Sequence, residues 1–455
     1  MPFNKLREYS GKGTFEFKMK EHLTIERNFN IRCFSNARVI VETSTLLSPS
    51  MAKIISGNQN ELFDISLNGI ITDVNGDIGT ISIERMFINS MNISAKKGEF
   101  VTFQLEFLCF SAVDIIYSDE KSGNIEIHYG LTNFIFSGCT YSEEDGKLLL
   151  DKFDANVNNI NFLFKKVEGY NELEKRLKEI KGCYITSEAI VNVLIAEREM
   201  AKSTIFDIIE LLSFATRNFV SPVYEDHFYN GELIRTILNP VLTKDYNAAD
   251  NLIDSNGSDP CTLQIFLEST YDKYQELKDV LGLNSIIHLY LISRSSIYSE
   301  SKFLLVVVSL ESLLSYFEEY LKTKGEPIKA SSLGRVKKIL AKKLEEEDIK
   351  TEDQIIERIA SSIAYAHPTF NDKLIPLLKK FNVKYYPKDL ELINLRNKIV
   401  HNGKFPEEFN SRLIDPHEEE TRLVYFLDRI LLSILDYRNK PFLNIYNKYQ
   451  SEELS

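Results

Sequence analysis

The sequence has few of the features that mark disulfide-rich, zinc-binding or membrane proteins. Its 455 residues include five cysteines, scattered without a Cys-x-x-Cys pair, so neither a disulfide framework nor a zinc site is expected. The longest apolar run, 303–308, is far too short to span a bilayer. Residues 1–9 contain no apolar segment of signal-peptide length. These absences predict a soluble protein of a reducing compartment, most simply the cytoplasm.

Basic residues are also fewer than acidic residues. The chain has 54 lysines and arginines against 66 acidic residues, a formal net charge of −12. This balance argues against a general nucleic-acid coat protein, so any RNA binding must use a local basic patch. The densest basic cluster, a candidate phosphate-binding surface, consists of Arg335, Lys337, Lys338, Lys342 and Lys343. Alternatively, this cluster is half of a solvated helix that pairs internally with the glutamates at 345–347.

Length and composition predict a globular chain of two or three domains. Apolar residues make up 44% and charged residues 26% of the sequence, as in soluble proteins. We predict the α+β class, with three regions along the chain. These are a β-rich N-terminal domain at 1–170, a mixed connecting region at 171–260 with a linker at 251–260, and a helical domain at 261–455.

The first region has the alternation of half-buried strands. Phe15 and Phe17 alternate with Glu16 and Lys18, and the stretches 101–107, 124–129, 147–153 and 159–164 follow at short spacing. Turn signals such as Asn68-Gly69 and Asp145-Gly146 lie between strands. This spacing predicts an antiparallel β sandwich or a jelly-roll-like domain.

The connecting region mixes helices and strands. Helices are expected at 171–181 and 203–216, and a hairpin over 219–238 is expected to turn at Asn230-Gly231. The aromatic residues of this hairpin either stack on RNA bases or pack across the two strands; they are Tyr224, His227, Phe228 and Tyr229.

From residue 262 onward apolar residues recur at helical spacing. The pattern predicts an up-down bundle of at least four long helices, including one over 303–317 and a last one entered through Asp415-Pro416. A shorter helix is expected over 355–363. Between these lies the stretch 389–403, which carries the polar residues of most interest.

The stretch 389–403 is predicted to be one helix. Pro387 suits its first turn, and Gly403 is well placed to end it. Leu392, Leu395 and Ile399 recur at the spacing of a buried stripe. The polar residues of this helix therefore lie beside or opposite a buried face.

Three of these polar residues suit phosphoryl chemistry. Arg396 has a planar, permanently charged group that matches phosphate oxygens, and His401 can transfer a proton near neutral pH. Asn397 lies four residues before His401 and shares its face of the helix. An ideal helix separates Arg396 and His401 by about 140° around its axis, so a long arginine and a frayed last turn are needed to bring them together.

The Arg-Asn-x-x-x-His pattern of residues 396–401 resembles the signature of HEPN-domain ribonucleases. The stretch 301–314, with Glu311 in an apolar setting, is similar to the helix that packs against the motif helix in that family. The C-terminal resemblance covers about residues 262–445. In layout, with a β-rich region ahead of the helical one, the whole chain resembles the ApeA-type anti-phage HEPN proteins.

The resemblance implies a HEPN-like helical domain that cleaves RNA without a metal ion or other cofactor. Two copies of the motif would face each other in a homodimer with a composite site. The partners implied are RNA, with tRNA among the candidate substrates, and a phage-derived trigger. Arg396, Asn397 and His401 would be catalytic, Glu311 would support Arg396, and Lys398 would join the basic cluster in binding RNA.

Other interpretations of the same residues remain open. Arg396 could simply pair with a nearby glutamate while His401 caps the helix C-terminus. Glu311 either faces the motif helix or lies at a solvated edge. Arg412 and His417 repeat the same spacing, but we expect them to straddle the junction between a loop and the last helix. The helical domain could also be a non-catalytic module that binds a nucleotide or a partner, with the β region recognising a ligand.

Overall fold

The protein is described here by a computed structural model. The structure describes residues 5–18, 23–34, 37–47, 64–72, 78–97, 100–118, 122–144, 147–180, 182–240, 246, 251–253, 261–296, 298–328, 331–346, 355–356, 358–359, 368–438, 441–444 and 450–453. The chain divides into two compact units. The first comprises Met1–Ala248 with Ser255–Gln264, and the second Ala249–Asp254 with Ile265–Ser455.

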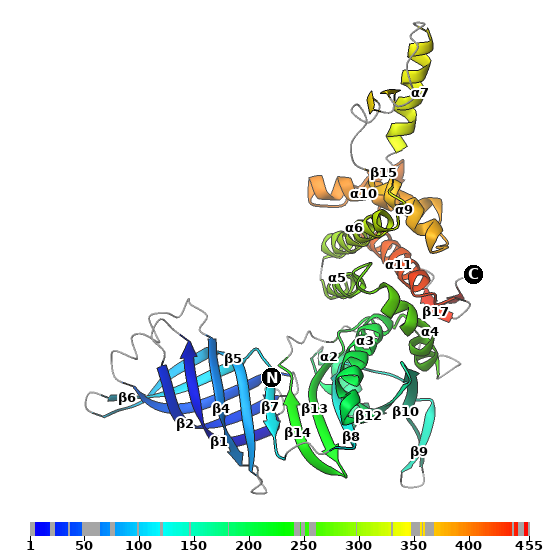
Figure 1. The fold of residues 1–455 in the computed structure, drawn as a ribbon. Coiled ribbons are helices and arrows are strands. Elements are labelled where there is room, and N and C mark those ends of the chain that lie inside the picture. The colour runs from blue at the N-terminus through cyan, green and yellow to red at the C-terminus, as the bar shows by residue number, and fades with distance from the viewer. Residues whose placement is uncertain are drawn as a thin grey trace. The chain divides into compact units, whose positions relative to one another are not determined.

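The first unit is built on one large antiparallel sheet. Fourteen strands from the described residues join it, in the order β4-β1-β2-β3-β6-β5-β7-β14-β13-β8-β12-β11-β10-β9 (Figure 1). Their bounds are β1 Lys5–Lys18, β2 Leu23–Phe34, β3 Val39–Leu47, β4 Asp64–Thr72, β5 Ile78–Lys97, β6 Phe100–Cys109, β7 Val113–Ile116, β8 Asn124–Thr132, β9 Thr140–Glu144, β10 Lys147–Val157, β11 Ile160–Lys166, β12 Ile185–Leu194, β13 Ser221–Tyr229 and β14 Glu232–Leu238.

Part of this sheet closes on itself. Strand β4 pairs with β1 on one side and with β5 on the other, so β4, β1, β2, β3, β6 and β5 form a ring. The predicted alternation of β1 is confirmed, because Phe15 and Phe17 are buried inside the ring. The ring of Phe15 stacks on that of Phe107 from β6, with centroids 5.4 Å apart. The α+β class and the N-terminal antiparallel β structure predicted from the sequence are therefore confirmed.

The sandwich or jelly-roll arrangement is not what the structure shows. The strands hydrogen-bond edge to edge into a single sheet, part of which closes into the ring, whereas a sandwich stacks two separate sheets. Strand spacing alone cannot distinguish the two, because both arrangements bury alternate residues of every strand. The choice is made by the pairing of β4 with β5, which closes the ring.

The expected turn at Asn68-Gly69 is also wrong, since both residues lie inside β4. A Cβ atom on Gly69 would lie 2.7 Å from the carbonyl oxygen of Lys12 and 2.8 Å from the Cα of Gly13 on the neighbouring strand. Glycine is required at this position because two backbones approach closely. The residue thus serves strand packing inside the ring.

The connecting region predicted at 171–260 contributes β12, β13 and β14 to the sheet of the first unit. Its predicted helices are confirmed as α2 (Tyr170–Ile180) and α3 (Arg198–Thr216), and α3 packs against β12 (Figure 1). The predicted hairpin is confirmed too. Asn230 and Gly231 have φ angles of 49° and 82°, as the two central residues of a tight hairpin turn require.

The aromatic residues of this hairpin pack within the sheet. Tyr224 is buried and donates a hydrogen bond from its hydroxyl to Glu188, over 2.5 Å. Phe228 lies against the ring of His128 on β8, with centroids 4.9 Å apart. Of the two interpretations left open, cross-strand packing describes these contacts.

The second unit is mostly helical, and among its described helices α6 and α11 contribute the most buried apolar side chains. Helix α6 contacts α5, α9, α10 and α11. The helices are α4 Thr262–Leu277, α5 Leu283–Ser295, α6 Ser299–Thr323, α7 Ser331–Glu346, α9 Phe370–Lys380, α10 Pro387–Asn402 and α11 Pro416–Ile434. Two small antiparallel pairs, from Glu408–Phe409 with Arg412–Leu413 and from Pro441–Asn444 with Gln450–Glu453, complete the described strands as β15 to β18. Of the short helix predicted over 355–363, residues 355–356 and 358–359 are described and are helical. The rest of that stretch and most of the predicted linker lie outside the described residues.

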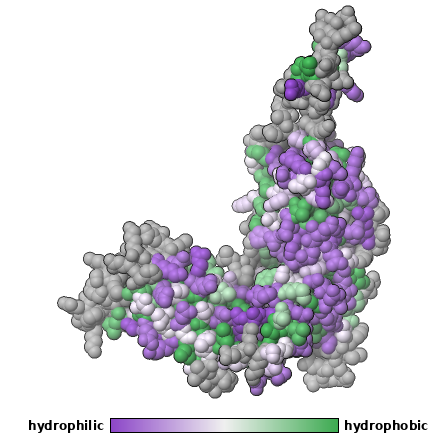
Figure 2. Space-filling view, in the orientation of Figure 1, coloured by the Kyte–Doolittle hydropathy of each residue, from purple (hydrophilic) through white to green (hydrophobic). Residues whose placement is uncertain are grey.

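Hydrophilic residues cover most of the visible described surface of the second unit, as the space-filling view shows (Figure 2). None of the described helices combines the length and the apolar composition needed to cross a bilayer.

Candidate functional site

Helix α10 forms as its sequence predicts. Pro387 stands at the start, and the Asp389 carboxylate accepts a hydrogen bond from the backbone N–H of Tyr386 over 2.7 Å. Gly403 ends the helix in the left-handed region, at φ 70°, and donates its N–H to the carbonyl of Ile399. The predicted apolar stripe is fully buried; it consists of Leu392, Leu395 and Ile399. The opposite face is left to carry polar groups.

Arg396 projects from the edge of this buried stripe to α6. Its Nη2 atom lies 2.6 Å from Oε1 of Glu311, and the two side chains are 33% and 36% exposed. The expected partner of Glu311 is therefore confirmed, but the carboxylate is only half-buried. The pair joins α10 to α6 at a place that solvent, and hence a ligand, can reach.

For the other two residues of the motif, Asn397 and His401, the structure describes only the position of the backbone. Asn397 lies one residue after Arg396 and His401 in the last turn of α10. Their side chains lie outside the described part of the structure. Lys398, the candidate RNA contact on the same helix, is exposed.

The second Arg-x-x-x-x-His match has a structural role. Arg412 lies in β16 and contacts the buried carboxylate of Glu419 through both terminal nitrogens, with Nη2 3.0 Å from Oε2. Hydrogen bonding to Glu419 raises the pKa of Arg412, although desolvation acts against it. His417 is 82% exposed at the start of α11, after the predicted cap Asp415. The two residues straddle a loop and a helix, as expected.

The basic cluster lies on α7 and favours internal pairing. Lys342 and Lys343 approach the carboxylate of Glu346 at 3.8 Å and 2.9 Å. Lys338 is exposed and Lys337 is half-buried, whereas the side chain of Arg335 lies outside the described residues. The described contacts therefore correspond to a solvated, charge-paired helix.

A buried ion pair anchors the start of α10, and the sequence analysis missed it. Nη2 of Arg429 on α11 lies 2.8 Å from Oδ2 of Asp389, and both residues are buried. The guanidinium carbon also lies 4.6 Å from the ring centroid of Tyr425 and 5.1 Å from that of Tyr386. The available signal was Arg429 itself, a cation inside the apolar stretch 423–434.

A second set of charges gathers at the start of α11. Glu419 and Glu420 are buried there, and Glu420 lies 3.3 Å from Arg294 of α5 and 3.9 Å from Lys302 of α6. Arg422 contacts Glu418 at 2.8 Å. Each buried acid thus faces cations from neighbouring elements, and the set joins α5, α6 and α11.

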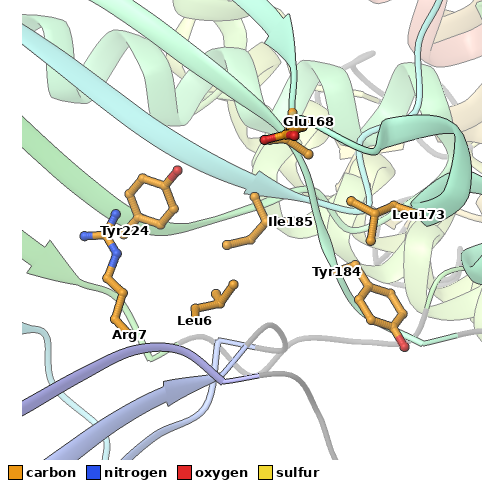
Figure 3. Close-up of a pocket in the computed structure, with 8 residues that line it drawn as sticks. Leu6, Arg7, Glu168, Leu173, Tyr184, Ile185 and Tyr224 are labelled. Atoms are coloured by element: carbon orange, nitrogen blue, oxygen red, sulfur yellow. The ribbon is translucent and has the colours of Figure 1, made fainter.

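The first unit contains a cavity of about 340 Å³. Figure 3 shows Arg7 and Tyr224 on one side of it, and Leu173 and Tyr184 on the other. Its described lining residues are Leu6, Arg7, Val167, Glu168, Leu173, Tyr184, Ile185 and Tyr224. The cavity is large enough for a small molecule and mostly apolar.

The arginine of this cavity is already paired. Both terminal nitrogens of Arg7 contact Asp226, at 2.7 Å and 2.5 Å, and its guanidinium lies 4.2 Å from the ring centroid of Tyr224. Burial acts to lower the pKa of Arg7, but hydrogen bonding and attraction to Asp226 raise it overall. A ligand in the cavity would therefore contact an arginine whose charge is already balanced by Asp226.

Within the described parts of the chain, no three histidine, cysteine or acidic residues gather closely enough to hold a metal ion. Comparison with known protein families, with curated proteins and with solved structures finds nothing that matches this chain.

Proposed function

We propose that the protein is a metal-independent endoribonuclease of the HEPN type, with α10 as the motif helix. The observation that carries the proposal is the contact between Arg396 and Glu311. The guanidinium of Arg396 projects from a helix with a buried face and is oriented by Glu311 of the neighbouring helix. The Arg396 side chain is still 33% exposed. An arginine held in this way can contact a phosphate without unfolding any part of the unit.

In the proposed reaction a ribose 2′-OH attacks the adjacent phosphorus. The bond from phosphorus to the 5′ oxygen breaks, leaving a cyclic phosphate and a 5′-OH. His401 transfers the protons, and Arg396 stabilises the negative charge that develops on the phosphoryl oxygens. Asn397 orients the phosphate or His401. As the family resemblance implies, two copies of α10 would complete one site in a homodimer.

The first prediction is that His401→Ala or Arg396→Ala abolishes cleavage of RNA, with a loss of at least about 10²–10³ in rate for the arginine. The measurement is cleavage of total RNA by purified protein in EDTA, with the ends of the products identified. Unchanged circular dichroism and thermal unfolding would show that the fold is intact.

His417→Ala is the matched control. His417 belongs to the second Arg-x-x-x-x-His match and is exposed, so its removal should leave both cleavage and stability unchanged. If His401→Ala cleaved RNA as fast as the unmodified protein, the assignment of α10 would fail.

The cavity of the first unit favours a second candidate from another class. In this alternative the helical unit is a non-catalytic, nucleotide- or partner-binding HEPN-like module, and the β-rich unit recognises a ligand or a phage protein. A space of about 340 Å³ lined mainly by apolar side chains is a suitable receptor for part of such a ligand. Binding without any RNA cleavage, unaffected by His401→Ala, would favour this alternative.

A further inference from the structure

The cysteines fall into two classes in the structure. Cys33, Cys109 and Cys183 are buried, whereas Cys139 and Cys261 are partly exposed. The two partly exposed thiols are neighbours: Sγ of Cys139 lies 3.6 Å from Oε1 of Gln264, three residues after Cys261 at the start of one helix, and a hydrogen bond with the Cys261 thiol contributes to raising the pKa of Cys139. They are separated by 122 positions in the sequence, so only folding brings them together.

Regular structure holds both residues in place. Cys139 immediately precedes β9, and its N–H donates to the carbonyl of Lys152 in β10 over 2.9 Å. Its Sγ lies 3.6 Å from Oε1 of Gln264 in the first turn of α4. Cys261 directly precedes that helix. All these residues belong to the first unit.

We propose that Cys139 and Cys261 are a thiol-modification site that closes into a reversible disulfide when the protein meets an oxidant of the hydroperoxide class. A disulfide needs two sulfurs that can approach without moving the backbone far, and Cys139 contacts the first turn of the helix that Cys261 precedes. In a reducing compartment such bonds are transient and respond to oxidants.

The chemistry needs two steps. The Cys261 thiol loses its proton, its thiolate attacks one oxygen of hydrogen peroxide, and the O–O bond breaks to give a sulfenic acid and hydroxide, which takes up the released proton as one water. The Cys139 sulfur then attacks the sulfenic sulfur, the S–O bond breaks, and the proton of Cys139 leaves with the hydroxide as a second water. Two thiols lose two electrons in total, and the peroxide gains them.

The surroundings of Cys139 support its role in the second step. Burial, followed by the hydrogen bond to Cys261, raises the pKa of Cys139 to about 12. A thiol with a raised pKa is seldom ionised at neutral pH, so we assign Cys139 to the second step, as the resolving thiol. Because the second step needs its deprotonation, disulfide formation should accelerate as the pH rises from 7 to 9.

The chain supplies its own control pair. Cys33 on β2 and Cys109 on β6 face the same core of the ring but lie on strands separated by β3. Both are buried in the ring, at 1% and 3% exposure. They test whether cysteines buried in the ring are spared, because the oxidant cannot reach either of them.

The test uses the full-length reduced protein, hydrogen peroxide as the probe, and alkylation of free thiols followed by mass spectrometry. Before oxidation, native alkylation should reach Cys139 and Cys261 and spare the other three cysteines. After oxidation, the tryptic peptides 122–147 and 245–273 should be joined within one chain. Dithiothreitol should release them. Absence of this linked pair, or a bond joining two chains instead, would overturn the proposal.

Two variants extend the test. Oxidation should raise the Tm of the unmodified protein by several degrees, because the bond restricts the unfolded chain. Cys261→Ser should abolish that rise, and Cys139→Ser should leave Cys261 trapped as its sulfenic or sulfinic acid. A rise in Tm that persists in Cys261→Ser, or a linked Cys33–Cys109 pair under native conditions, would contradict it. None of these readouts depends on RNA cleavage.

Discussion

At the scale of single residues, Arg429 carries a permanent charge in a position with no exposed side-chain surface. Its charge is met by Asp389 and by the faces of Tyr425 and Tyr386. Removing water from a charge is costly unless a partner lies at hydrogen-bonding distance. The pair is therefore expected to matter more for the placement of α10 than any exposed ion pair of the second unit.

Asp389→Ala should lower the free energy of unfolding of the second unit by about 3–5 kcal/mol, because it leaves Arg429 buried and unpaired. Urea unfolding followed by circular dichroism measures this loss. Glu319→Ala is the control. Its contact with Lys322, at 3.4 Å and with both side chains largely exposed, should contribute less than about 1 kcal/mol. Equal effects of the two substitutions would show that Asp389 is not the anchor.

At the scale of elements, α6 is joined to two neighbouring helices by similar ion pairs. Glu311 contacts Arg396 of α10 at 2.6 Å, and Glu318 contacts Lys373 of α9 at 2.6 Å. Both acids lie on the same helix, seven residues apart. Only the first pair includes a residue of the proposed active site, so the two form a matched set.

If the proposed function holds, Glu311→Gln should lower kcat/KM for RNA cleavage by about tenfold, because Arg396 is no longer fixed toward the phosphate. Glu318→Gln should leave cleavage unchanged. Steady-state kinetics on one defined RNA would compare the two. Equal activity of both variants and the unmodified protein would remove Glu311 from the mechanism.

The ion pair between Glu318 and Lys373 also makes the stability of the fold depend on pH. The hydrogen bond from Lys373 lowers the pKa of Glu318 in the folded protein. A carboxylate whose pKa falls on folding stabilises the fold fully above its unfolded value of about 4.3, and this contribution is lost as the pH falls through the folded value. The stability lost between pH 5 and pH 3 should therefore be smaller in Glu318→Gln.

At the scale of the whole molecule, a β-rich unit and a helical unit share one chain. If the helical unit is the proposed nuclease, the full-length protein should be toxic when over-expressed or triggered in bacteria. His401→Ala should remove the toxicity, and His417→Ala should not. Colony counts after induction measure the effect, with equal protein levels checked by immunoblot. Toxicity that survives His401→Ala would point to a cause other than cleavage by α10.

Sequence reasoning predicted α10 well because all its signals are local. A proline, three apolar residues at helical spacing and a terminal glycine lie within 17 positions, from 387 to 403, and tertiary packing agrees with them. It failed at Asn68-Gly69, because a glycine can mark a turn but can also be required where two backbones approach closely, as Gly69 is in β4. Local patterns cannot distinguish those two uses.

The amino-acid sequence by itself determined the α+β class, the existence and approximate extent of α10, the start of α11, and the alternation of β1, because these depend on neighbours within a few residues. Only the tertiary structure decided that β4 closes a ring with β5, that Asp389 meets Arg429, and that Cys139 meets Cys261. Each of those contacts joins positions that are distant along the chain. Such a contact depends on the packing of all the intervening elements, and no spacing within one segment encodes it.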